Sequence, residues 1–214
     1  TNTLVLESSY KANIGRDSLK FQYTHSASED RRIDPSVTNI IDLFVLTRSY
    51  DTSFKNYLVG ATTIAPLAPS SDELRIAFGA GLSAIKSISD EVVYHPVKYK
   101  VLFGAAADTK LQAKFKVVKN TGKTINDNNL KVRIVNAMND FFDINNWDFG
   151  DRFYLSELST YVLNVVSPDI SNLVILPRQS SQAFGSLFEI QSKPDEIFAN
   201  GATVDDIELV TSIT

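Results

Sequence analysis

The stretch Asn146-Trp147-Asp148-Phe149-Gly150-Asp151 decides the fold of this chain, because it joins two segments that have the hydrophobic spacing of helices. Trp147 is the chain's only tryptophan, and Phe149 and Phe153 stand close to it in the sequence. Aromatic side chains of this size supply much of the burial energy of a small domain. The pattern therefore predicts a joint between two packed helices, with Trp147 buried between them and no sign of chemistry.

Both segments beside this joint repeat apolar residues every three or four positions. Asn126-Asp127 offers an N-cap for the first helix, and Pro168 ends the second, which starts near Ser156, because proline cannot continue a helix. The stripe of the first helix is Leu130, Ile134, Ala137, Met138 and Phe141. The stripe of the second is Leu158, Tyr161, Val162 and Val165.

Alternating polar and apolar residues predict strands on both sides of these helices. Residues 97–103 and 114–117 each place lysines on one face, and a hairpin closed by the loop 104–110 would join them. Residues 173–176 form a closing strand, and 184–190 and 207–213 are later strands.

The first ninety residues predict a smaller set of elements. Residues 19–23 and 40–46 have strand patterns, 50–58 a short helix, and 65–71 a turn-rich connector. A helical pattern begins at Ser71 and runs towards Ile88, and Gly79 and Gly81 mark a break in it.

These elements predict an α+β fold, with mixed or antiparallel sheets and helices packed on one face. A chain of 214 residues with 43% apolar content can bury a sizeable core in one or two domains. We divide it into an N-terminal part (1–90), a central α+β unit (91–178) and a β-rich C-terminal segment (179–214). The absence of cysteine excludes disulfides and thiolate zinc sites. We expect the chain to be a piece of a longer polypeptide, since it begins at Thr1 and stops in an apolar run.

Charge is distributed unevenly along the chain. Residues 91–133 carry nine Lys/Arg against three Asp/Glu, a net +6, whereas 188–214 carry one against six, a net −5. Such blocks are either solvated faces or the two sides of a contact between copies. The candidates for a contact are Lys98, Lys100, Lys114, Lys116, Phe184, Leu187, Phe188, Ile197, Phe198, Asp205 and Asp206.

The sequence contains little that indicates an enzyme or a ligand-binding site. Asp140, Asp143, Asp148 and Asp151 fall on a helix end and a turn that would solvate them. His95 precedes a proline and suits a surface or interface position, and a helix cap explains Ser156 better than a nucleophile elbow does. The sequence also lacks a phosphate loop, a calcium loop and any nucleic-acid motif. We expect no enzymatic activity, no cofactor, no metal, no small-molecule substrate, and no binding to nucleic acid or membrane.

The order of five sequence segments along the chain resembles that of a known protein family. It consists of a Lys-rich strand, a helix ending in Phe141-Phe142, a glycine turn, a Ser-x-Leu helix and an apolar strand. The pieces are 113–118, 130–142, 147–150, 156–162 and 173–176. They resemble the baseplate J group of contractile phage tails. The flanking segments 87–91, 94–99 and 184–188 are similar, more narrowly, to the C-terminal part of the baseplate wedge proteins of T-even-type phages.

This resemblance implies a structural component of the viral baseplate. Such a protein forms homodimer or ring contacts, binds other wedge proteins, and takes part in the rearrangement that accompanies sheath contraction. The implied location is the tail baseplate of the virion, after assembly in the host cytoplasm. The alternative is a ligand- or receptor-binding tail module, which would show clustered exposed aromatics in its loops.

Overall fold

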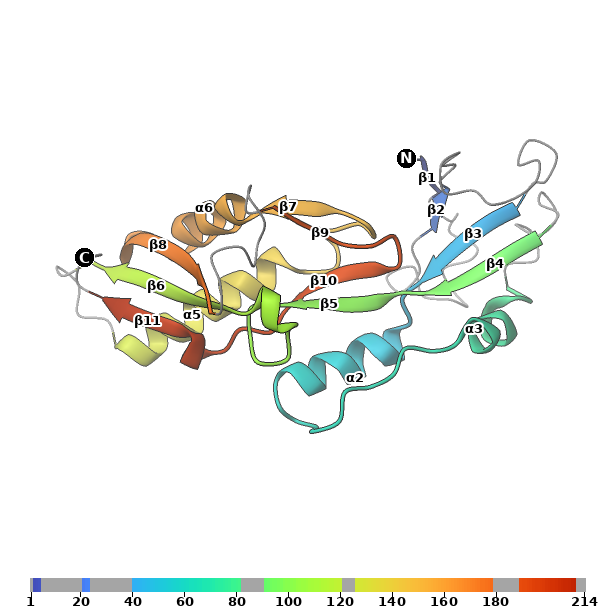
Figure 1. Cartoon of the computed structure of the whole chain (residues 1–214), viewed down its shortest axis with the longest axis horizontal. Helices are drawn as coiled ribbons and strands as arrows, with labels where there is room; N and C mark the ends of the chain where they lie inside the picture. The colour runs from blue at the N-terminus through green and yellow to red at the C-terminus, as the bar shows by residue number, and fades with distance from the viewer. Residues whose placement is uncertain are drawn as a thin grey trace. The chain divides into compact units, whose positions relative to one another are not determined.

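The computed structural model describes residues 2–4, 21–23, 40–81, 91–120, 126–178 and 189–210 of the 214-residue chain. It divides the chain into two compact units, Thr1–Lys98 and Tyr99–Thr214 (Figure 1). These bounds differ from the predicted 1–90, 91–178 and 179–214. The strand at 91–96 pairs with one from the first unit, and the C-terminal strands pair with strands of the second.

Within the residues that the structure describes, the first unit contains two short ladders and two helices. Strand β1 (Asn2–Leu4) pairs antiparallel with β2 (Phe21–Tyr23), and β3 (Ile40–Val45) pairs in parallel with β4 (Glu91–Pro96). Helix α2 spans Arg48–Leu58 and α3 spans Ser71–Phe78. The core of this unit includes Leu43, Val45, Tyr50, Phe54, Leu74, Tyr94 and Val97. The predicted strand at 40–46 and helix at 50–58 are therefore confirmed.

Helix α3 is shorter than the helical pattern suggests. It ends at Phe78, and Gly79 is its C-cap residue, which agrees with the break expected from the glycines. The later stripe residues Leu82, Ile85 and Ile88 lie outside the described residues.

The second unit is built around a mixed three-stranded sheet. Strand β6 (Ala113–Lys119) lies between β8 (Ile170–Pro177), which is antiparallel to it, and β11 (Ile207–Val210), which is parallel (Figure 1). Two further ladders are β5 (Lys98–Leu102) with β10 (Glu196–Asn200), and β7 (Arg152–Tyr154) with β9 (Glu189–Gln191). The mixed sheet confirms the predicted α+β class.

Two helices cover the core of this unit. Helix α5 (Asp127–Phe141) starts at the N-cap Asn126, as predicted, and buries Leu130, Ile134, Ala137 and Met138. Helix α6 (Leu155–Val166) stops two residues before Pro168 and buries Leu155, Leu158, Val162 and Val166. These side chains join those of β6, β8, β10 and β11 in one hydrophobic core.

The predicted hairpin between 97–103 and 114–117 is wrong. Strand β5 pairs with β10, and β6 pairs with β8 and β11. The chain turns at Phe103, whose φ is 77°, passes through a short 3₁₀ helix (η3, Thr109–Leu111), and comes back with Gln112 in a parallel bridge to Phe103. Because this bridge is parallel, β6 does not fold back along β5.

Gly104 is required where β5 meets the end of β10. A Cβ atom at this position would lie 1.6 Å from the carbonyl oxygen of Gly201. The neighbouring Gly201 N–H donates to the Leu102 carbonyl at 2.9 Å. The two backbones therefore approach more closely than any side chain allows.

Candidate contact surfaces

The predicted joint around Trp147 is an aromatic cluster in the core of the second unit. Trp147 lies 5.3 Å from Phe141, 5.6 Å from Phe153 and 5.3 Å from Phe198 between ring centroids, each in an edge-to-face arrangement. Its indole Nε1–H donates to the Phe141 carbonyl at 2.6 Å. The ring is partly buried, and β7 follows it before α6 begins. Trp147 thus links the end of α5 to β10.

The acidic residues around this joint hold the turn together. An Asp151 carboxylate oxygen accepts the Asp148 N–H at 2.7 Å, and an Asp143 oxygen accepts the Asn145 N–H at 2.9 Å. Asp140 is exposed at the end of α5. Turn geometry accounts for Asp143 and Asp151, since each accepts a hydrogen bond from a backbone N–H of the turn that follows α5.

His95, another residue weighed for chemistry, has structural partners, and Ser156 lies in the first turn of α6. His95 is half-buried on β4, with Nε2 at 2.8 Å from a carboxylate oxygen of Asp42 on the neighbouring strand, and its ring stacks on Phe44. The cap expected at Ser156 is wrong: α6 begins one residue earlier, and its N-cap is Tyr154, whose N–H donates to Glu157 at 3.0 Å.

The basic and acidic blocks come together within the second unit. In the parallel pair of β6 and β11, Glu208 is the register partner of Lys116. Neighbouring strands lie about 4.8 Å apart, so the two side chains share one face of the sheet at close range. Lys100 on β5 lies 3.5 Å from Glu196 on β10. Opposite charges that would suit a contact between copies therefore face each other within one chain.

Asp206 is a buried anchor of the C-terminal segment. Its side chain is 4% exposed, and it forms an ion pair with Arg178, just beyond β8. The same carboxylate accepts the N–H of Thr203 at 2.8 Å and its hydroxyl at 3.2 Å. It thereby caps η4 (Val204–Asp206), the turn that leads into β11.

The predicted contact residues differ in their exposure to solvent. Lys98, Lys114 and Asp205 are exposed, and Lys100 and Lys116 are half-buried. Ile197 and Phe198 are 0% exposed and Asp206 is 4% exposed, so the prediction of a contact role is wrong for these three. Ile197 and Phe198 belong to the core because β10 runs through the second unit, and Asp206 is buried against Arg178. Phe184, Leu187 and Phe188 lie outside the described residues.

The outer edge of β8 is poorly suited to adding a strand. Arg178 N–H donates to the Gln112 carbonyl, so by alternation Leu173, Ile175 and Pro177 direct their backbone groups away from β6. The Leu173 N–H is taken by the side chain of Asn172 at 2.8 Å, and Pro177 has no N–H. Two of three outward donors are removed, as in edge strands protected from aggregation.

Sequence reasoning missed an exposed apolar surface in the first unit. The segment 59–70 between α2 and α3, here called the neutral arm, contains no charged residue and exposes Val59, Ile64 and Leu67 to 78%, 81% and 93%. The available signal was the run 56–71, the longest stretch of the chain without Asp, Glu, Lys or Arg. Its prolines favoured the interpretation of the segment as a connector, and its lack of charged residues was therefore not used.

The ionisable groups with shifted pKa values are structural. Backbone and side-chain hydrogen bonds from Ser70 lower the pKa of Glu73 in the first turn of α3. Burial raises the pKa of the Tyr94 phenol on β4. In the described residues, no three His, Asp or Glu side chains gather as metal ligands would.

Comparisons with known proteins place the chain in no group. No protein-family model matches it, and no curated protein matches it. Among the helices that the structure describes, none combines the length and apolar character needed to cross a bilayer.

Proposed function

We propose that this chain is a structural component of a contractile-tail baseplate wedge, which associates with copies of itself and with other wedge proteins. One observation carries the proposal: the order of pieces that resembles the baseplate J group. In the fold these pieces are β6, α5, the Trp147 turn, α6 and β8, all elements of the second unit. A resemblance spread over one packed unit supports common ancestry better than scattered matches would.

The side chains weighed for catalysis also support a role without chemistry. General acid–base catalysis needs a group that can reach a substrate. Asp143 and Asp151 instead accept backbone hydrogen bonds in a turn, and His95 is paired with Asp42. We expect the purified chain to contain no stoichiometric zinc or calcium. Elemental analysis that finds one metal ion per chain would contradict this part of the proposal.

A ligand- or receptor-binding tail module is less well supported. Glycan recognition would draw on clustered aromatic side chains at the surface. Among the large apolar side chains that the described residues expose, Tyr154 is the only aromatic one, and it is 39% exposed. Specific binding on a glycan array would favour this alternative.

The location in the particle tests the main proposal directly. Antibodies raised against the purified chain should label contractile-tail particles at the baseplate, as seen by immunogold electron microscopy. Antibodies depleted on the purified chain are the control. Label confined to the sheath, the fibres or the head would contradict the proposal.

A further inference from the structure

The neutral arm is fixed at its first end by the last turn of α2. The N–H groups of Val59, Gly60 and Ala61 donate to the carbonyls of Lys55, Tyr57 and Asn56 at 3.1, 3.0 and 2.9 Å. Gly60 adopts a φ of +76°, which a side chain would strain, and this turns the chain away from the helix.

The other end is fixed by the first turn of α3. Ser70 N–H donates to a Glu73 carboxylate oxygen at 2.7 Å, and Glu73 N–H donates to the Ser70 hydroxyl at 3.2 Å. This reciprocal capping box satisfies two donors of the helix end. A segment held at both ends loses less conformational entropy on binding than a free loop does.

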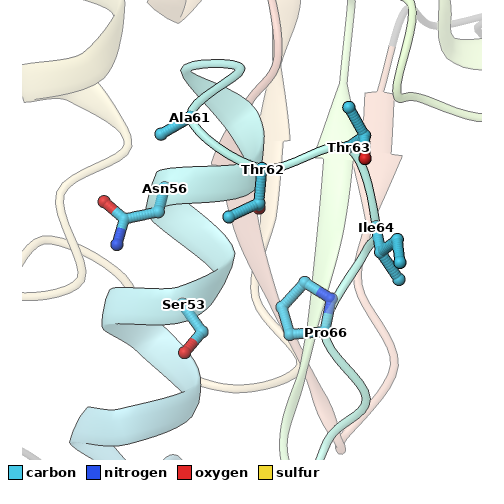
Figure 2. A pocket seen from close by; sticks show the side chains of 7 residues that line it. All are labelled: Ser53, Asn56, Ala61, Thr62, Thr63, Ile64 and Pro66. Carbon is cyan, nitrogen blue, oxygen red and sulfur yellow. The ribbon is translucent and has the colours of Figure 1, made fainter.

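A hollow lies between the arm and α2. Figure 2 shows Ser53 and Asn56 on the helix and Thr62, Ile64 and Pro66 on the arm that turns back beside it. Ala61 and Thr63 complete the lining, which contains hydroxyl, amide and aliphatic groups and no ionisable side chain. A charged partner surface placed here would lose its hydration without gaining an opposite charge.

Of the six other large apolar residues that the described chain exposes, three stand next to a charged residue in the sequence. Ile76 follows Arg75 on α3, Val132 lies between Lys131 and Arg133, and Val204 precedes Asp205. Tyr154, Val165 and Leu176 have neutral neighbours but stand singly on β7, α6 and β8. The arm differs because it gathers three exposed apolar side chains in one segment without a charge. The surface of this chain that best matches a neutral arm is therefore the neutral arm of a second copy.

We propose that the neutral arm and its hollow form the contact between two copies of this chain, related by a twofold axis. In such a contact the same patch is used on both sides. Ile64 and Leu67 of each copy cover the hollow of the other, while Ser53, Asn56 and Thr62 bond to backbone groups of the incoming arm. This inference rests on the self-association in the proposed function and assigns a surface to it.

The test measures the dimer dissociation constant by sedimentation equilibrium for the chain and two variants. Leu67→Asp should raise the constant roughly a hundredfold or more, because each dimer loses two apolar anchors worth about tenfold or more apiece. Ile76→Asp is the matched control, since this residue is 78% exposed on α3 among charged side chains. It should change the constant by less than about twofold, an ordinary surface substitution. Because dimerisation itself raises the melting temperature, melting is compared at a concentration at which all three chains are monomeric, and the melting temperatures there should be equal.

The possible outcomes separate this inference from the proposed function. A parent chain that dimerises equally well with Leu67→Asp overturns the inference and leaves self-association intact. A parent chain that stays monomeric at every concentration overturns both. If Leu67→Asp lowers the melting temperature of the monomer, the arm packs within its own chain. If Leu67→Asp abolishes the binding of a purified wedge protein to a monomeric chain, the arm contacts a different subunit. Either of these last two results also overturns the inference.

Discussion

Trp147 is partly buried and packs against the hydrophobic core of the second unit. Trp147→Ala removes a ring that contacts Phe141, Phe153 and Phe198, and it removes the hydrogen bond to the Phe141 carbonyl. We expect a loss of about 3–5 kcal/mol in the free energy of unfolding, as for other large aromatic truncations. Urea denaturation measures it, and native emission of the single tryptophan should be blue-shifted.

Trp147→Phe provides the comparison for this experiment. It keeps one aromatic ring in the cluster and removes the indole donor and part of the ring volume, so it should destabilise much less than the alanine variant. Equal stability of Trp147→Ala and the parent chain, together with red-shifted emission, would show that the ring makes no contribution to the core.

Glu73 gives the first unit a pH dependence at residue scale. Hydrogen bonds from Ser70 hold its folded-state pKa below the ordinary value of 4.5. A depressed carboxyl pKa contributes stability above the unfolded value, and that contribution disappears as pH falls through the folded value. We expect the amide protection factors at the start of α3, which correct for the slower intrinsic exchange in acid, to fall below pH 4.5 in the parent chain. Glu73→Gln should show less of this change, and an identical acid response in both would contradict the assignment.

At the scale of elements, the helices and the sheet strands were predictable to different degrees. The stripe from Leu130 to Phe141 and the N-cap Asn126 gave α5 nearly to the residue, because helix periodicity and capping are local. Strand pairing was not predictable in the same way. One of the two partners of β6 is β11, some ninety residues along the chain, and nothing in the alternation of Lys114 and Lys116 specifies it.

The candidate contact residues show the same division between local and long-range information. Asp205 and Asp206 are adjacent acids with the same appearance in the sequence, yet one is exposed and the other is buried against Arg178. Ile197 and Phe198 appeared to be apolar residues beside an acidic tail. The position of β10 in the second unit, which brings them into the core, depends on pairing with β5.

The segment between β10 and β11 offers a matched pair of charge reversals. Asp206→Lys would bury a cation beside Arg178 and remove the cap of Thr203, so we expect a loss of about 3–5 kcal/mol in the free energy of unfolding. Asp205→Lys changes the same charge at an exposed neighbour and should cost within about 0.5 kcal/mol. Thermal and urea denaturation of the two variants measure the difference.

Equal effects of the two reversals would contradict the structural role of Asp206. The result also bears on self-association, because a double reversal that dissolves a dimer by unfolding the subunit says nothing about its contact surface. Asp205→Lys alone is therefore the variant with which to probe a charged interface.

At the scale of the whole molecule, the uneven charge has an internal explanation. Lys100 is paired with Glu196, and Glu208 stands beside Lys116 on one face of the sheet. A net +6 segment and a net −5 segment thus balance each other in the folded second unit. The charges remaining at the surface are of both signs, which favours solubility over attraction between copies.

The salt dependence of self-association follows from this balance. If copies met through their basic and acidic blocks, dimers would weaken between about 50 and 500 mM salt, because screening shortens the reach of exposed charges to a few ångströms. A contact through the neutral arm contains no charge to screen. We therefore expect the dimer dissociation constant to stay within about threefold over this range, since rim charges chiefly affect rate and register. Sodium sulfate should tighten the dimer, because it strengthens the burial of apolar surface. A tenfold weakening with sodium chloride, reduced by Asp205→Lys, would instead assign the contact to the charged segments of the second unit.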